Sequence, residues 1–150
     1  MQIFAEEGVS PEELKAYLKE RDLALVVSRD VTTRDRSDRQ QPFNVRVAGG
    51  TAETIPEGGV GYDVRYMQFF QGDQIRGYGS SEGRRVLAMP MHEEIENPPS
   101  TGAQGSVTLG PDGSMAAMIP AHRAMTWQLT DPQNEPVIRE RYWLSFQAGE

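Results

Sequence analysis

The sequence predicts an all-β fold, an antiparallel β-sandwich with one short N-terminal helix. Five segments alternate apolar and polar residues with a period of two, which is typical of half-buried antiparallel strands. Only one segment carries the signals that begin a helix. Turn-forming pairs separate the alternating segments, namely Gly49-Gly50, Gly58-Gly59, Gly72-Asp73, Asp112-Gly113 and Asp131-Pro132. Short strands joined by such turns favour a sandwich.

The single predicted helix is SPEELKAYLKER, residues 10–21. Ser10 is suited to cap its N-terminus, Pro11 fits the first turn, and Glu13 completes a capping box. A helix of about three turns is marginal by itself in water, so we expect it to dock on the sheets. Its docking face would carry Leu14, Tyr17 and Leu18.

Two strands are predicted in the first third of the chain. Residues 23–28, LALVVS, place three large apolar side chains on one face: Leu23, Leu25 and Val27. Residues 42–47, PFNVRV, alternate inward and outward side chains: Phe43, Val45 and Val47 against Asn44 and Arg46. Residues 28–41 mix charges of both signs and predict an exposed loop.

Three strands are predicted in the rest of the chain. Residues 60–70 align Val60, Tyr62, Val64, Tyr66 and Phe70. Residues 125–130 set Met125, Trp127 and Leu129 against Thr126, Gln128 and Thr130. Residues 137–146 align Ile138, Tyr142, Leu144 and Phe146. Residues 92–105 are acidic and proline-rich, which predicts weak structure. We expect residues 1–22 to form an N-terminal segment with the helix, and residues 23–150 to form one β-sandwich module.

Composition excludes several classes of function. The net charge of −7 argues against a nucleic-acid partner, because phosphate binding needs a cationic face. The absence of cysteine excludes disulfides, thiolate zinc sites, iron–sulfur clusters and covalently attached c-type haem in this chain. No apolar run is long enough to span a membrane. The N-terminus MQIFAEEGVS is no signal peptide, so we expect a cytoplasmic protein or an export signal outside this chain.

Methionine and histidine cluster twice and predict a candidate copper site. Thioether and imidazole together suit soft metal ions, and the chain has only two histidines. The candidate ligands are His92, His122 and Met118. The alternative interpretation is that the methionines fill gaps in the core and that His92 opens a loop.

Aromatic residues predict a second candidate, a face that stacks on carbohydrate or another ligand. Tyr142 and Trp143 are adjacent on a predicted strand, so they point to opposite faces and one of them is expected to be exposed. Trp127 belongs to the same candidate set. The alternative is that a neighbouring domain covers the outward ring. No nucleophile, base and acid stand in a pattern that predicts an enzyme.

Residues 105–150 carry a pattern that resembles a known family. Its parts are an Asp-Gly-Ser turn at 112–114, the pair Pro120-Ala121, the strand Trp127-Gln128-Leu129, and an ending with Phe146, Gln147, Gly149 and Glu150. The pattern is similar to the middle domain of the hydrazine synthase alpha subunit and of related multidomain bacterial cytochrome-like proteins. The segments DRQQPFNVRV and YMQFFQGDQIRGYG look similar to the same group, so the resemblance covers most of residues 21–150.

In that family the ending is followed by Cys-x-x-Cys-His, which attaches a c-type haem. This chain ends at Glu150 and has Ala148 where proline is usual. We therefore expect either a domain taken from a longer haem protein or a natural variant that lost its haem segment. The resemblance implies a periplasmic or extracellular parent, adjacent domains as partners, and no haem ligand within this chain. Arg139 and Arg141 would pair with haem propionates or a docked domain, or else form a solvated strand face.

The sequence thus favours a non-catalytic structural or docking module of an extracytoplasmic c-type haem protein. A carbohydrate- or ligand-binding module is the first alternative, with the candidate residues Trp127, Arg139, Arg141, Tyr142 and Trp143. A copper-binding module is the second.

Overall fold

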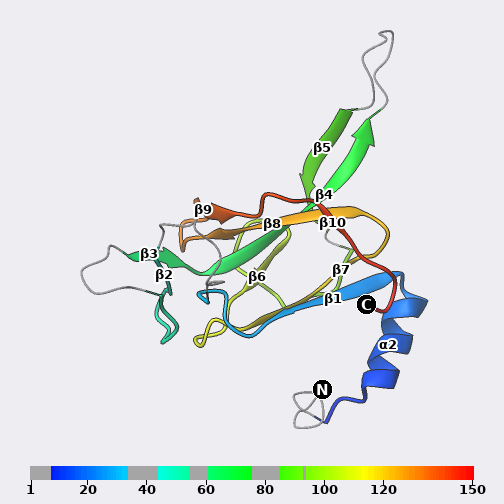
Figure 1. Ribbon diagram of the computed structural model, residues 1–150, viewed down its shortest axis with the longest axis horizontal. Helices are drawn as coiled ribbons and strands as arrows, with labels where there is room; N and C mark the ends of the chain where they lie inside the picture. Colours follow the sequence, from blue (N-terminus) through cyan, green and yellow to red (C-terminus); the bar gives the residue numbers. More distant parts are fainter. Residues whose placement is uncertain (1–7, 34–43, 55–60, 76–84, 93) are drawn as a thin grey trace.

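The computed structural model describes residues 8–33, 44–54, 61–75, 85–92 and 94–150. Within these ranges one helix, α2 (Pro11–Glu20), is accompanied by ten strands, most of them antiparallel. The predicted all-β fold with one short helix is confirmed (Figure 1). The strands are β1 (Leu23–Ser28), β2 (Asn44–Val47), β3 (Gly61–Val64), β4 (Tyr66–Ile75), β5 (Arg85–Pro90), β6 (Ser106–Thr108), β7 (Met115–Pro120), β8 (Ala124–Thr130), β9 (Pro136–Arg139) and β10 (Leu144–Ser145).

The helix begins where the sequence predicts. The Ser10 hydroxyl accepts a hydrogen bond from the Glu13 backbone N–H at 3.3 Å, and Pro11 occupies the first turn. The cap satisfies one of the N–H groups that the helix itself leaves without a partner. Leu18 is buried where α2 packs on β1, so tertiary packing stabilises a helix too short to persist alone.

The larger sheet is built around β4. Strands β10, β8, β4 and β5 follow one another across it, while β6 pairs with β4 and β9 pairs with β8. One edge of β4 binds β8 along Tyr66–Gln71, and the other edge binds β6 first and then β5. With partners on both edges, β4 is a central strand and both of its faces are extensively covered.

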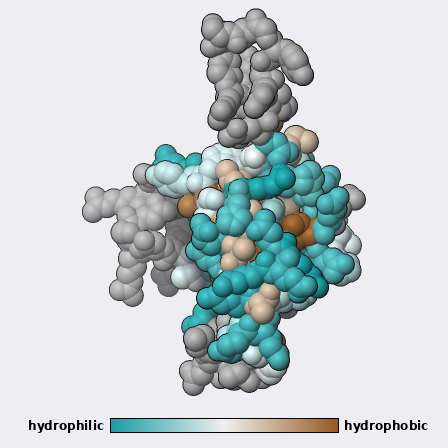
Figure 2. All heavy atoms as spheres, turned by 90° about the vertical axis from the view of Figure 1, so that its right-hand side faces the viewer, coloured by the Kyte–Doolittle hydropathy of each residue, from teal (hydrophilic) through white to brown (hydrophobic). Residues whose placement is uncertain are grey.

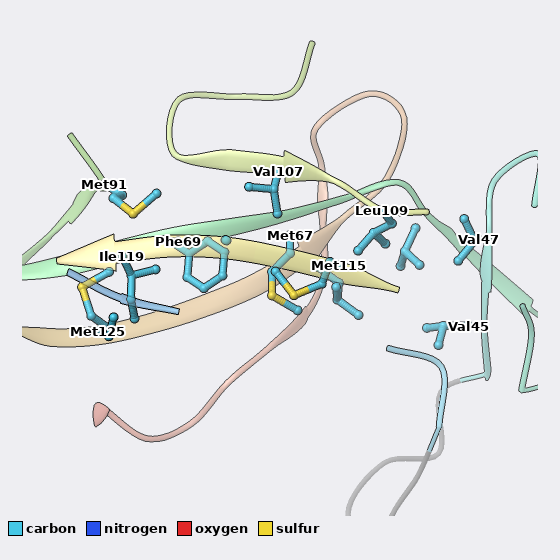
Figure 3. Packing of buried hydrophobic residues seen from close by; sticks show 14 residues of the cluster. Val45, Val47, Met67, Phe69, Met91, Val107, Leu109, Met115, Ile119 and Met125 are labelled. Carbon is cyan, nitrogen blue, oxygen red and sulfur yellow. The ribbon is translucent and has the colours of Figure 1, made fainter. Parts of the chain in front are cut away.

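The second sheet is the antiparallel pair of β1 and β7, which Figure 1 shows below β4 and β8. One apolar cluster draws residues from both sheets, as the predicted sandwich requires. In Figure 3, Phe69, Met67 and Met115 lie in the middle of this cluster, with Ile119 and Met125 at one end and Val45 and Val47 at the other. Four methionines, Met67, Met91, Met115 and Met125, are buried here, in agreement with the gap-filling interpretation.

The large apolar residues of β1 are not the ones that enter the core. Ala24 is completely buried and Val26 packs against the core cluster. Val27, which the alternation aligns with Leu23 and Leu25, is 51% exposed. The core-facing set is therefore the one with smaller side chains.

Strands β2 and β3 differ from the prediction in direction. They pair in parallel, from Asn44 opposite Gly61 to Val47 opposite Val64. Val45 and Val47 are buried as predicted and Arg46 is exposed, but Asn44 is buried as well. Phe43 and Val60, two other predicted inward residues, lie outside the described residues.

The predicted strand 137–146 is interrupted. Strand β9 pairs with one end of β8 and β10 pairs with the other end. Between them a Glu140 carboxylate oxygen accepts the N–H groups of Arg141 and Tyr142 at 2.7 and 3.1 Å, which turns the chain out of the ladder. The chain then crosses to the smaller sheet. There Gly149 N–H donates to the Leu23 carbonyl at 2.8 Å, and Leu25 N–H donates to the Glu150 carbonyl at 2.9 Å.

The proline-rich segment predicted as weakly structured makes specific contacts where it is described. The Asn97 side chain accepts from the Met118 N–H at 2.7 Å and donates to the Met118 carbonyl at 2.9 Å. The amide thus acts as a one-residue partner for the free edge of β7. Further along, the Gln104 carbonyl accepts from Gln68 at 3.0 Å. This part of the chain therefore contacts the edge of β7 and the outer face of β4.

No helix in the described ranges is long and apolar enough to cross a membrane. Figure 2 views the molecule from the side that carries α2 and the C-terminal end. Hydrophilic residues dominate this side, and its apolar residues form small separate spots.

Candidate functional site

A depression lies on the face of the larger sheet that points away from the core. Side chains alternate along a strand, so Phe70 and Thr126 project opposite to the buried Phe69 and Met125. The depression has a volume of about 510 Å³, within the usual range for small-molecule sites. It is lined by Phe70, Ala88, Thr126, Arg139, Glu140, Arg141 and Trp143. We call it the outer-face site.

Two buried glutamines support the outer-face site from one side. Gln68 and Gln128 are opposite each other on β4 and β8, and only 7% and 6% of them is exposed. Gln128 Nε2 donates to Gln68 Oε1 at 2.9 Å, and Gln68 Nε2 donates to the Gln104 carbonyl at 3.0 Å. Arg139 is the last member of this series of hydrogen bonds, because its Nε and Nη2 both donate to Gln128 Oε1, at 3.4 and 3.2 Å.

The orientation of the two glutamine amides follows from the first acceptor in this series of hydrogen bonds, the Gln104 carbonyl. The Gln104 backbone carbonyl can only accept, so Gln68 must turn its NH₂ toward it and its Oε1 toward Gln128. Gln128 must then donate to Gln68, which leaves its own Oε1 facing Arg139. The Gln104 carbonyl thus fixes, through the two glutamines, the orientation of the Arg139 guanidinium on β9.

The other side of the outer-face site is held by Glu140. Its N–H donates to the Trp127 carbonyl at 2.9 Å, and its carbonyl accepts from the Thr126 hydroxyl at 3.4 Å. Its carboxylate holds the backbone of the next two residues, as described above. Glu140 therefore anchors the turn that carries Arg141 and Trp143 to the rim.

The lining combines apolar surface with excess positive charge. Phe70, Ala88 and Trp143 supply carbon surface, and Trp143 is 42% exposed. Two guanidinium groups face one carboxylate, in a protein whose net charge is −7. Among the described parts of the chain, no carboxylate lies within 4.0 Å of the guanidinium of Arg139 or Arg141. The site can accordingly receive a partner that is flat, partly apolar and anionic.

Three of the five predicted ligand-binding residues meet at this site, namely Arg139, Arg141 and Trp143. Trp127 does not, because it lies on the core side opposite Phe69, with ring centroids 5.9 Å apart. Tyr142 is 68% exposed and is not part of the lining. The predicted strand alternation is not found here, because Tyr142 and Trp143 lie between β9 and β10 and both are exposed; Trp143 is the one that lines the site.

Sequence reasoning missed the floor and the support of the site. Phe70, Ala88 and Thr126 belong to three strands that only the pairing brings together. The polar residues that alternate with the apolar ones in β8 could have indicated this support. Gln128 and Thr126 are buried, so the polar face of that pattern is a second covered face.

The three candidate copper ligands are placed separately in secondary structure. His92 follows β5, and its N–H donates to Gln71 Oε1 at 3.3 Å. His122 lies in the turn between β7 and β8, with Nε2 3.4 Å from an Asp22 carboxylate oxygen. Met118 is half-buried on β7. Within the described ranges no three His, Asp or Glu side chains are grouped to hold a metal ion, and the copper site stays a prediction.

Comparison of the chain with protein-family models, with curated proteins and with solved structures gives no match. The resemblance to hydrazine synthase alpha-like proteins therefore rests on the residue pattern alone.

Proposed function

We propose that this chain is a binding module whose outer-face site holds a ring-shaped polar ligand, with carbohydrate as the class. One observation carries the proposal: Trp143, Phe70 and two arginines converge on a single depression of suitable volume. An aromatic side chain offers a flat apolar surface to the C–H face of a sugar ring. Arginine, threonine and carboxylate groups around it can hydrogen-bond to hydroxyls.

The arrangement supports binding more directly than group transfer. Two charged side chains of the depression are tied into the scaffold, Arg139 through the glutamines and Glu140 through backbone N–H groups. Such fixed groups lower the cost of ordering side chains when a ligand binds. We accordingly assign them to recognition and orientation of the ligand.

The test is tryptophan fluorescence and calorimetry across a panel of neutral and charged oligosaccharides. Binding should change the emission of Trp143, and a Trp143→Ala variant should lose both the signal and the heat. Tyr142→Ala is the matched control, because it removes a more exposed neighbouring ring that does not line the site. Failure of the whole panel to bind, or equal loss in both variants, would contradict the proposal.

A structural or docking module of an extracytoplasmic c-type haem protein is the second proposal. It is supported by where the resembling residues lie. The Asp-Gly-Ser segment forms a turn in which the Ser114 N–H and hydroxyl both donate to an Asp112 carboxylate oxygen, at 3.0 and 2.6 Å. Gly149 and Glu150 pair with β1. The pattern thus coincides with residues that shape the fold, which favours a shared scaffold.

This second proposal has its own test in the native reading frame. A Cys-x-x-Cys-His sequence after Glu150, together with Soret absorption of the longer product, would support it. A frame that continues into an unrelated domain without haem would count against it. The neighbouring domain, the haem and the periplasmic or extracellular location belong to this proposal.

A further inference from the structure

We infer that the outer-face site selects an acidic sugar, a uronic acid residue whose carboxylate pairs with Arg139 and Arg141, over a neutral sugar. The inference rests on the proposed carbohydrate-binding function. It is carried by the fixed orientation of one guanidinium, by the local charge, and by apolar surface next to both.

Arg139 is held in place but keeps free donors. A guanidinium has five N–H groups, and the two contacts to Gln128 Oε1 occupy only one edge of it. Gln128 is a neutral acceptor, so it orients the charge without cancelling it. The remaining N–H groups can bind a carboxylate in the paired geometry that arginine favours.

Glu140 offsets only one of the two positive charges at this site. One of its carboxylate oxygens already accepts two backbone N–H groups, from Arg141 and Tyr142. Its charge stabilises the turn, while the two guanidinium groups remain available to a ligand. In a protein of net charge −7, such a local excess of positive charge favours a ligand that is itself negative.

Because part of the site is apolar, a bare inorganic anion fits it less well than an acidic sugar does. Phosphate or sulfate would use the arginines but leave Phe70, Ala88 and Trp143 without contact. A pyranose ring with a carboxylate at one end satisfies both parts, because its ring face covers the aromatic surface while the carboxylate reaches the arginines. The volume of about 510 Å³ accommodates a sugar residue with its neighbour.

The experiment compares three probes by calorimetry at neutral pH: di-galacturonic acid, its methyl ester, and the corresponding neutral galactose disaccharide. The acid is expected to bind at least ten-fold more tightly than the other two, because charge-assisted hydrogen bonds are the stronger ones. Raising the salt concentration should reduce this preference.

Two variants test the residues. Arg139→Gln and Arg141→Gln should each lower the affinity for the acid about ten-fold or more and lower the affinity for the methyl ester much less, because the ester loses only neutral hydrogen bonds. Arg29→Gln is the matched control, because Arg29 is an exposed arginine just after β1, outside the site. Circular dichroism and thermal unfolding should show that all three variants fold like the parent.

The failures are distinguishable. Equal affinity for all three probes would overturn the acidic-sugar inference and leave the carbohydrate-binding proposal standing. No binding of any sugar would overturn both. Binding of benzoate without binding of the uronate would also overturn the inference, because the apolar surface would then hold an aromatic acid.

Discussion

The two faces of the larger sheet differ in the side chains that they bury, apolar ones on the inner face and hydrogen-bonded polar ones on the outer face. The inner face presents Met67, Phe69, Met125 and Leu129 to the β1–β7 pair, and burial of apolar surface holds the two sheets together. The outer face is also largely covered, yet Gln68, Gln128 and Thr126 lie there. Burying an amide costs free energy unless it is hydrogen-bonded, and both glutamines are. One face therefore contributes stability, and the other contributes orientation.

This difference teaches where a binding site is to be sought in such a fold. An apolar face packs into a core and leaves no group for a ligand. The polar covered face fixes Arg139 at the rim through bonds that run across β4 and β8. A polar network held by hydrogen bonds across two strands gives a rigid support, which is what precise recognition requires.

The largest expected effect on stability comes from replacing a phenylalanine, and it should differ between the two faces of the larger sheet. Phe69 is completely buried, so Phe69→Ala should lower the free energy of unfolding by about 3–5 kcal/mol, as measured by urea denaturation. Phe70 is half-buried on the opposite face, and Phe70→Ala should cost less than half as much while abolishing ligand binding. Equal losses of stability at the two positions would remove the proposed distinction between the faces.

An intermediate effect is expected from the outer-face network. Gln128→Leu leaves the buried Gln68 Oε1 without its donor, which should cost about 1–3 kcal/mol in urea denaturation. It also frees Arg139 from its acceptor, so the affinity for an acidic ligand should fall while Trp143 stays in place. In a double-mutant cycle with Gln68→Leu, the combined loss should be smaller than the sum of the single losses. Additive losses would mean that the two amides act independently.

The smallest effect is expected at the Asp112 turn, which lies outside both faces. Hydrogen bonds from the Ser114 hydroxyl and N–H lower the pKa of the exposed Asp112 carboxyl below its ordinary value. A lowered pKa in the folded state means that the stabilisation is present at neutral pH and is lost as the pH falls through that folded value. The difference in Tm between the parent and Asp112→Asn should therefore be small at pH 7, begin to shrink at about pH 4, and vanish only at lower pH, below the folded pKa. A Ser114→Ala variant should weaken this pH dependence, and a difference in Tm that grows in acid would contradict the assignment.

Much of the fold could be predicted from the apolar–polar alternation of the strands and from the helix-capping residues. Ser10 and Pro11 predicted the start of α2, and the β8 pattern predicted the buried Met125 and Leu129. The face of β1 was not accessible, because Ala24 gives almost no hydrophobic signal, although it is the residue that meets the opposite sheet. The parallel pairing of β2 and β3 was missed because half-buried alternation is more typical of antiparallel strands, although it does not fix the direction of any one pair.

The candidate site was predictable only in part, for a physical reason. Arg139, Arg141 and Trp143 are close together in the sequence, so one segment revealed them. The fixed orientation of Arg139 depends on Gln104, which lies far from it in the sequence and reaches it through two glutamines on different strands. No local pattern encodes such a chain of contacts.

The pairing of β1 with the end of the chain also determines when the protein is able to fold. Leu23 and Leu25 form hydrogen bonds with Gly149 and Glu150, and the whole of β1, from Leu23 to Ser28, pairs with β7. During synthesis, β1 leaves the ribosome long before any of these partners does. Contacts so distant in sequence are expected to make refolding slow, in the range of milliseconds to seconds.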